Sequence, residues 1–386
     1  MYKIAENVLS WCNDPEAGAQ FQAMNIARHP CLIGNVCLMP DTHEGYGMPI
    51  GGVVALENAV CPNMVGVDIG CGMLAVRTSI TEKPGREELC RVVQKIRASV
   101  PVGTSHQSTP QPDELFDEPI WSSNSVCCFA CENAKRQLGT LGGGNHFIEL
   151  QWGDDGHMWF MIHSGSRNLG KKVADYYNNI AVELCTRWRQ IECVRDQLAF
   201  LPRGTTEYTD YMREMNACIR FGQANRRHIA DAVIRAISEV FSSQCPDFAD
   251  PINIKHNYAT LEHHYGKDVM VHRKGATLAR KGVIGIIPGS QGSCSYIVEG
   301  LGNEASLCSC SHGAGRRMSR SRARSVLSLE DEVAKMDACG IVHGISCSDD
   351  LDEAPSAYKD IDTVMREQAD LVKPLVRLSP LAVIKG

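Results

Sequence analysis

The chain has 386 residues, 44% of them hydrophobic and 22% charged, so it can bury the core of one large domain or of two ordinary ones. Its net charge of −6 excludes a generally basic protein of the histone type, so contact with nucleic acid would need a local patch. The first residues do not resemble an export signal, and the 18 cysteines are dispersed, which favours reduced core thiols over a disulfide framework. We therefore expect a cytoplasmic globular protein without a membrane span.

The first third of the chain predicts alternating short elements. Residues 1–35 are expected to form a short helical lead-in, and residues 35–40 (NVCLMP) a buried strand that ends at a proline. Strand-like segments alternate with glycines over residues 50–76, and residues 81–100 predict an amphipathic helix. Residues 101–131 begin with a stretch rich in Pro, Ser, Gln and Asp, which indicates a loop insertion.

The middle of the chain, residues 171–245, carries helical periodicity and predicts a mostly helical scaffold. Within it, Arg226, Arg227 and His228 are interpreted as a solvated helix face. Short strands are expected again near the end of the chain. Together these elements predict an α+β fold of mixed sheets, in which residues 1–386 form one domain around a central cleft.

The turn at residues 66–73, GVDIGCGM, places Asp68 and Cys71 three residues apart among glycines. A carboxylate and a thiolate offer one hard and one soft metal ligand, and the glycines let the backbone fold tightly behind them. Two ligands do not complete a site, so other segments must supply histidines. By contrast, Cys128 and Cys131 form an isolated Cys-x-x-Cys pair, which favours cysteines buried in a helix over a zinc site.

Three histidines lie beside glycine, asparagine or serine, mostly where predicted strands end: His146, His163 and His256. A lone histidine in such a place is more often structural than catalytic. His163, however, is followed by two hydroxyls and Arg167, which are donors suited to an anion. Combined with the carboxylate and thiolate of the glycine-rich turn, these ligands predict a two-metal site in which Cys71 could bridge.

Two polar loops stay open to a structural or a functional interpretation. Residues 41–47, DTHEGYG, follow a predicted strand and suit an active site, but a surface turn capped by Asp41 fits these residues equally well. Residues 288–293, PGSQGS, could wrap a planar or phosphorylated ligand or form a simple hairpin turn.

His312 lies in a run of small residues, SCSHGAG, before a segment that predicts a helix continuing through Lys335. Small residues before a helix expose its first amides, so the sequence predicts an anion site with His312 at the helix entrance. Positive charge and oriented amides would suit an imidazole that attacks phosphorus.

The arginines that follow are expected to form a phosphate-binding patch. Arg316, Arg320 and Arg324 are four residues apart and would share one face of the predicted helix. The alternative is a solvated face on which the arginines pair with the acidic residues further along, Glu330, Asp331 and Glu332.

The chain resembles the RtcB-type RNA ligases, which join RNA ends using GTP and manganese. The resemblance runs almost from end to end and rests on the segments MPDTHEGYG, GVDIGCGM, GTLGGGNHFIEL, HSGSR, HNY, RKGA, IPGS, GLGNE, SCSHGAGR and AYKDID and on the final Lys385-Gly386. The chain departs from many relatives at Gln291, where they carry methionine, and it is short for the family. These departures leave the natural RNA open.

The resemblance implies a role for each site residue. One Mn²⁺ would be held by Asp68, Cys71 and His146 and a second by Cys71, His163 and His256. His312 would become guanylylated, and the RNA phosphates would lie at Arg167, Arg316 and Arg320. The guanine nucleotide would lie at Asn145, His146, Phe147, Ile148, Glu149, His256, Asn257, Pro288, Gly289, Ser290, Gln291, Ser295, His312, Gly313, Ala314, Gly315 and Lys385.

The implied reaction joins an RNA 3′-phosphate or 2′,3′-cyclic phosphate to a 5′-hydroxyl through an RNA-(3′)pp(5′)G intermediate, in tRNA splicing or RNA repair. Three other activities stay open at this point. The protein could cap nucleic-acid 3′-phosphates with guanylate without ligating them, act as a metal-dependent phosphohydrolase, or serve as a non-catalytic RNA-binding subunit. His312 and Lys385 favour the ligase over a hydrolase, because simple hydrolysis requires neither a covalent guanylate nor a nucleotide site.

Overall fold

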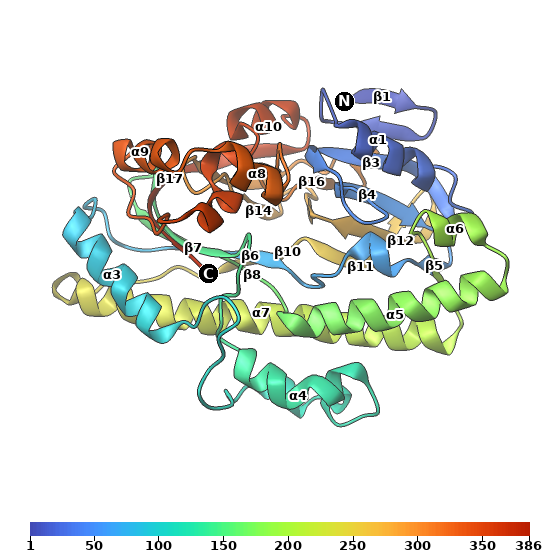
Figure 1. Ribbon diagram of the computed structural model, residues 1–386, viewed down its shortest axis with the longest axis horizontal. Coiled ribbons are helices and arrows are strands. Elements are labelled where there is room, and N and C mark those ends of the chain that lie inside the picture. The colour runs from blue at the N-terminus through green and yellow to red at the C-terminus, as the bar shows by residue number, and fades with distance from the viewer.

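The computed structural model describes residues 1–386 and contains two large β-sheets with helices packed around them (Figure 1). The expected α+β class is confirmed. The first sheet has six strands in the order β1 (Tyr2–Ala5), β2 (Val8–Ser10), β3 (Leu32–His43), β4 (Ile50–Leu56), β12 (Lys267–Lys274) and β11 (Asn257–His264). Its neighbours are antiparallel except for β2 and β3, which run parallel.

The second sheet has seven strands, all antiparallel to their neighbours, in the order β10 (Ile252–Lys255), β6 (Gly72–Arg77), β8 (Met158–Ser164), β7 (Phe147–Gly153), β17 (Val372–Lys385), β15 (Ser295–Gly300) and β14 (Ile284–Ile287). His163 pairs with Met73 on one side and with Phe147 on the other. The starts of β6 and β7 therefore lie beside the end of β8, at one edge of the sheet.

Two small sheets complete the strands. β13 (Ala276–Leu278) pairs with β16 (Ser309–Ser311), and β5 (Ala59–Val60) pairs with β9 (Leu201–Pro202). Short 3-10 helices occupy several connections: η1 (Glu114–Asp117), η2 (Pro119–Trp121), η3 (Ser242–Gln244), η4 (Glu304–Ser306), η5 (Ser348–Glu353) and η6 (Pro355–Ala357).

The helical middle of the chain is confirmed as α5 (Asn168–Arg187), the short α6 (Ile191–Arg195) and α7 (Thr206–Val240). In Figure 1, α5 and α7 run side by side beneath the sheets. One half of α7 buries Ile229 and Val233 with residues of the seven-stranded sheet, and the other half joins the largest hydrophobic cluster. No helix of the structure is both long enough and apolar enough to cross a membrane.

The expected helix at residues 81–100 is confirmed as α3 (Arg86–Ser99), which begins after Pro84-Gly85. Residues 101–125 form the expected loop, with η1 and η2 inside it, and α4 (Val126–Gln137) follows. The Cys-x-x-Cys pair lies on α4, as expected, and belongs to neither group of closely spaced metal-binding side chains. Only the neighbouring Cys127 is fully buried, whereas Cys128 and Cys131 are half-buried.

The prediction of a helical lead-in at residues 1–35 is wrong in its first part. The chain starts with the β1–β2 hairpin, and only α1 (Ala17–Ile26) is helical. β2 pairs with the edge of β3, with Val8 opposite Val36, and both side chains are fully buried. Strand pairing and burial in the sheet outweigh the local preference for helix.

The prediction of one helix from the arginines through Lys335 is also wrong. The segment contains two short helices, α8 (Arg320–Val326) and α9 (Leu329–Ala338), and α10 (Ile361–Glu367) lies closer to the C-terminus. The side chains of Ser319 and Ser328 each accept a hydrogen bond from an amide in the first turn of α8 and α9, respectively, so the helix restarts at each serine. Arg316 lies before α8, opposite Tyr358 in an isolated bridge, and shares no helix face with Arg320.

Candidate functional site

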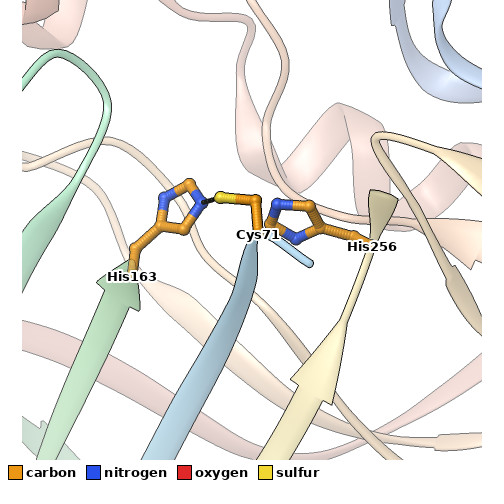
Figure 2. Close-up of side chains that lie close together, drawn as sticks. All are labelled: Cys71, His163 and His256. Carbon is orange, nitrogen blue, oxygen red and sulfur yellow. Dashed lines mark hydrogen bonds between the residues drawn. The ribbon is translucent and has the colours of Figure 1, made fainter. Parts of the chain in front are cut away.

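Four candidate ligands lie at the same edge of the seven-stranded sheet. Cys71 directly precedes β6, His146 directly precedes β7, His163 is the penultimate residue of β8, and His256 directly follows β10. Because β10, β6, β8 and β7 are neighbours, these side chains converge. Figure 2 shows Cys71 between the imidazoles of His163 and His256, each carried by its own strand.

These side chains and Asp68 form two groups of three that share Cys71: Asp68, Cys71 and His146, and Cys71, His163 and His256. The Cys71 Sγ lies 3.3 Å from His163 Nε2 and 3.4 Å from His146 Nε2. His146 Nε2 is 3.4 Å from Asp68 Oδ2. Ligands placed about 2.0–2.3 Å from one metal ion lie roughly 3.3–3.8 Å from one another, so this spacing fits metal binding.

The protonation of the site also suits metal binding. Burial, followed by repulsion from the neighbouring imidazoles, lowers the pKa of His163 and His256 well below the ordinary value, so both are neutral and able to coordinate. Burial and the charge of Asp68 raise the pKa of the Cys71 thiol. Binding a cation would oppose that effect and release the thiol proton.

Backbone carbonyls and amides orient the ligands. His146 Nδ1 donates to Leu141 O at 3.0 Å, which leaves Nε2 free to coordinate. Asn257 Nδ2 donates to Asp68 O at 3.0 Å, and Asn257 Oδ1 accepts from Gly275 N at 2.8 Å. Asn257 therefore ties the turn that carries Asp68 to the start of β11.

Arg226 of α7 contradicts its interpretation as part of a solvated helix face. Its side chain is fully buried, and Nη1 donates to Gly70 O at 3.1 Å and to Ser164 O at 2.7 Å. Those carbonyls belong to the segments that carry Cys71 and His163. The guanidinium thus links the two segments through hydrogen bonds, whereas the side chain of its neighbour Arg227 is exposed.

His312 lies directly after β16 and well before α8, so its predicted position at a helix entrance is wrong. Its Nδ1 is 2.7 Å from Asp41 Oδ2, and its backbone amide donates to the same oxygen at 3.1 Å. Because a carboxylate oxygen accepts, Nδ1 donates and Nε2 keeps its lone pair. The ring centroid is 4.8 Å from that of His256, beside the ligand groups.

Asp41 is a buried residue of β3 and does not cap a surface turn. Lys359 Nζ donates to the flanking carbonyls, Pro40 O at 3.1 Å and Thr42 O at 2.7 Å, and so supports this end of the strand. Gly315 has φ +73°, and a Cβ there would lie 2.2 Å from Asp41 O. The close approach of the His312 loop to Asp41 therefore requires glycine at this position.

A cavity of about 750 Å³ connects the ligand groups to His312. Most of the predicted nucleotide residues line it: Asn145, Phe147, Glu149, His256, Asn257, Pro288, Gly289, Ser290, Gln291, His312, Gly313, Ala314, Gly315 and Lys385. The side chain of Ile148 instead belongs to a hydrophobic core cluster. Ser295 is buried, and its Oγ accepts from Gly289 N at 3.1 Å, so it supports the loop at residues 288–291.

Glu353 gathers three cations at the cavity wall and is only 4% exposed. Its carboxylate lies 3.2 Å from Arg316 Nη1, 3.1 Å from Arg320 Nε and 3.7 Å from Lys385 Nζ. Tyr358 OH also donates to it. The proposed pairing of the arginines with the acidic residues of α9 is therefore wrong for these two arginines, because the partner comes from η5.

Arg167 approaches the site from another side, at the N-terminal end of α5. Its Nε donates to Thr140 Oγ1 at 3.1 Å and its Nη2 to Gly103 O at 2.8 Å. The backbone of Arg167 has φ +59°, a conformation that non-glycine residues rarely adopt outside functional segments. This places a guanidinium against the glycine-rich loop that leads to His146.

Comparison with known proteins agrees with this arrangement. A family model described as tRNA-splicing ligase RtcB matches residues 22–121 and 119–386. The RNA-splicing ligase RtcB of Escherichia coli (strain K12) is 37% identical over 393 residues, which cover 96% of this chain and 95% of that protein. The chain belongs to the RtcB family of RNA ligases. The tRNA-splicing ligase RtcB of Nanoarchaeum equitans (strain Kin4-M), 32% identical over 437 residues, covers 95% of the chain and 91% of its own length.

Three charged residues shape the site of this RtcB-family chain beyond the roles that the sequence predicted for them: Arg226, Lys274 and Glu353. Lys274 is almost fully buried, and burial lowers its pKa to about 8. Its Nζ donates to Tyr46 O at 2.6 Å and Met48 O at 3.0 Å, so it supports the loop after β3. A charged residue inside a predicted strand, as in RKGA, is the one available signal. Neither Arg226 nor Glu353 has a comparable local pattern.

Proposed function

We propose that this protein joins RNA ends bearing a 3′-phosphate or 2′,3′-cyclic phosphate to 5′-hydroxyl ends, using GTP and two Mn²⁺ ions, through guanylylated His312 and an RNA-(3′)pp(5′)G intermediate. The observation that carries the proposal is the contact between His312 Nδ1 and Asp41 Oδ2 at 2.7 Å. It leaves Nε2 as a nucleophile in the cavity that Asp68, Cys71, His163 and His256 also line.

The metal ions would be held by the two groups that share Cys71. Asp68, Cys71 and His146 would hold one ion, and Cys71, His163 and His256 the other. When bound, the ions would neutralise phosphate oxygens and help to orient the reacting groups. The mixed oxygen, nitrogen and sulfur donors are compatible with a divalent transition metal.

In the first step, His312 Nε2 forms a bond to the α-phosphorus of GTP and pyrophosphate leaves. The Nδ1 proton stays on the imidazole, where Asp41 stabilises the positive charge that develops. A 3′-phosphate oxygen of the RNA then attacks the guanylate phosphorus, and His312 leaves. Finally, the 5′-hydroxyl attacks the activated 3′-phosphate and GMP departs. A 2′,3′-cyclic phosphate would first be hydrolysed to the 3′-phosphate.

Glu149 and Lys385 support recognition of guanine. Glu149 Oε1 is buried without a hydrogen-bond partner, and burial raises the pKa of this carboxyl well above its ordinary value. Guanine presents N–H donors on the edge next to its O6 acceptor, so Glu149 Oε1 could accept a hydrogen bond from that edge while the Lys385 ammonium donates to O6. Asn145, Phe147, Asn257 and residues 288–291 and 312–315 would surround the nucleotide, with Ile148 acting through its core packing between Phe147 and Glu149 and Ser295 through the loop that it supports.

We propose that Arg167, Arg316 and Arg320 contact the RNA phosphates. Arg320 is the most available of the three, because its side chain is 47% exposed and only Nε engages Glu353. Arg316 also donates to Met318 O and Asp352 O, so its contribution would require an exchange of partners. The cavity draws residues from Glu16 to Lys385, which supports one catalytic domain spanning the chain. We further propose a cytoplasmic role in tRNA splicing or RNA repair.

Labelling with GTP tests the covalent step. The protein would be incubated with α-labelled GTP and Mn²⁺, beside His312→Ala and, as a matched control, His263→Ala, whose side chain is 70% exposed and distant from the cavity lining. We expect acid-labile label on the parent and on His263→Ala but not on His312→Ala. An unlabelled parent, or a labelled His312→Ala, would refute the guanylylated histidine.

The second experiment separates ligation from the two alternative activities. Labelled protein would receive RNA or DNA with 3′-phosphate and 5′-hydroxyl ends. A joined RNA product supports the ligase, capped ends without joining support a guanylyltransferase, and phosphate release without GTP consumption supports a phosphohydrolase.

A further inference from the structure

An aromatic side chain stands unpaired at the rim of the cavity. Tyr46, in the loop between β3 and β4, is 72% exposed and lines the same cavity as His312 and Cys71. It is the most exposed tyrosine of the chain, and no aromatic ring or cation packs against its face. Its ring therefore offers both an apolar surface and direct access to the reaction centre.

The backbone behind this ring is held firmly. Tyr46 O accepts from Lys274 Nζ at 2.6 Å and from Met48 N at 2.7 Å. The preceding residue, Gly45, donates its amide to Gln22 Oε1 at 3.1 Å, and Gln22 Nε2 donates back to Gly45 O. A ring presented by an ordered backbone loses little conformational entropy when a ligand stacks on it.

The charge around Tyr46 favours a base over a phosphate. Two acidic residues, Glu16 and Glu44, line the cavity on this side, and Glu44 N donates to the Glu16 carboxylate. The three cations that contact Glu353 are paired with that carboxylate, and none of them packs on the Tyr46 ring. Lys274 is the cation next to Tyr46, and its Nζ is already engaged by three carbonyls, Tyr46 O, Met48 O and Asn63 O. Phosphates would be drawn to the cations around Glu353, whereas the amino groups of adenine, cytosine and guanine can donate to the carboxylates here.

A second exposed apolar side chain adds to this surface. Val67 is 43% exposed, lines the cavity, and directly precedes the metal-ligand candidate Asp68. Exposed aromatic rings in cavities that also carry aliphatic side chains and carboxylates are surfaces on which single-stranded nucleic acids commonly stack their bases.

We propose that Tyr46 is a stacking platform for a nucleobase of the RNA next to the join. The proposal deepens the RNA-ligase function and rests on it. Stacking of one unpaired base on Tyr46 would hold the strand so that its terminal phosphate or hydroxyl reaches the cavity. It would also favour single-stranded ends over paired ones, because a base within a duplex has no free face.

Substitutions at Tyr46 test the platform against a matched tyrosine elsewhere. Tyr176 of α5 is also exposed, at 51%, but it lies outside the cavity lining and packs edge-on against Tyr177. We expect Tyr46→Ala to weaken binding of single-stranded RNA about tenfold, and to raise its KM in ligation similarly. Tyr46→Phe and Tyr46→Trp should retain binding, and Tyr176→Ala should match the parent.

An abasic substrate series identifies the contact itself. One nucleotide at a time near each RNA end would be replaced by an abasic one, and the dissociation constant measured by fluorescence anisotropy with the parent and with Tyr46→Ala. At one position, we expect the abasic nucleotide to weaken RNA binding by the parent about tenfold and to leave RNA binding by Tyr46→Ala unchanged. The proposal would be overturned if both proteins lost equal RNA affinity at every abasic position. It would also be overturned if Tyr46→Phe bound RNA as weakly as Tyr46→Ala.

Labelling with GTP distinguishes this proposal from two other outcomes. Tyr46→Ala should label at the parent's rate and with the parent's KM for GTP, because the platform serves RNA. A raised KM for GTP would mean that the ring stacks on the guanine of the nucleotide, and it would overturn the proposal. An unlabelled parent would refute the guanylylated histidine alone, because RNA affinity is measured without GTP.

Discussion

The ligand groups around Cys71 and the cations around Glu353 line one cavity but are built in different ways. The ligands lie at the ends of adjacent strands, so the register of one sheet brings them together. The cations come from the segment before α8, from the start of α8 and from the end of β17, and they meet because one buried carboxylate attracts them. The ligand groups thus depend on backbone pairing, whereas the cation cluster depends on charge.

This difference predicts how each region responds to substitution. Substitution of a candidate metal ligand should abolish catalytic activity but leave the fold intact, because the strands stay paired. Loss of the central carboxylate should instead cost stability and leave three cations without their shared partner, since a buried charge needs compensation.

The largest effect is expected for Cys71→Ala, which removes the ligand shared by both groups. On the proposed two-metal site, the variant should bind neither ion, and ligation should fall by more than about 100-fold, the upper range for residues that only support a metal ligand. Metal content after gel filtration provides the measurement. Cys185→Ala, a buried thiol in the largest core cluster, is the control. Two retained metal ions in Cys71→Ala would show that Cys71 is a neighbour of the site and does not bridge.

Next in size is Asp41→Asn, which keeps the shape of β3 but removes the charge that holds His312. The amide can donate to Nδ1 and so favour the wrong tautomer of the imidazole. We expect the rate of labelling by GTP to fall by about 10²–10⁴-fold. The exposed Asp14→Asn serves as a control. An unchanged labelling rate would show that the contact at 2.7 Å does not orient the nucleophile.

Arg226→Met tests the cation buried beneath the ligand groups. It leaves Gly70 O and Ser164 O without their donor, and the free energy of unfolding should fall by about 3 kcal/mol. The exposed neighbour Arg227→Met should stay within about 0.5 kcal/mol of the parent. Urea denaturation measures both. Equal stability of the two variants would mean that Arg226 does not brace the strand ends.

Glu353→Gln tests the cation cluster through its pH dependence. Burial alone would raise the pKa of Glu353, but Lys385, Tyr358 and the two arginines outweigh burial and hold the pKa below its ordinary value of 4.5. A lowered carboxyl pKa stabilises the fold above the unfolded pKa, and that stability is lost as the pH falls through the folded pKa. The parent should therefore exceed the variant by about 2–3 kcal/mol at pH 7, and the difference should shrink in acid. A difference that is constant with pH would point to packing alone.

The smallest effect is expected for Arg320→Ala, which removes one exposed cation of the cluster. RNA affinity should fall a few-fold, and the dependence of log K on log salt should lose about 0.7 of its slope, as for one phosphate contact to a single strand. Arg322→Ala, on the exposed surface of α8, should leave the slope unchanged. A salt dependence equal to that of the parent would exclude Arg320 as a phosphate contact.

Local patterns in the sequence predicted the candidate metal ligands. His163 lies at the end of a hydrophobic strand and Cys71 in a glycine-rich turn, and both are local patterns that can be recognised without a structure. The same local patterns predicted α3, the helical middle and the strands that end at the site. Local reasoning was weaker at residues 316–335, where helical periodicity concealed the serines that start α8 and α9 separately.

Which charged side chains meet depends on the tertiary fold. Glu353 is one of 45 acidic residues, and nothing near it in the chain indicates that it would gather Arg316, Arg320 and Lys385. The same holds for Arg226. The helical pattern of the sequence predicts an exposed side chain, and only the packing of α7 against the sheet buries it. Strand ends are specified by short-range patterns, whereas the partner of a charged side chain is selected in space, by burial and by distances that the chain order does not contain.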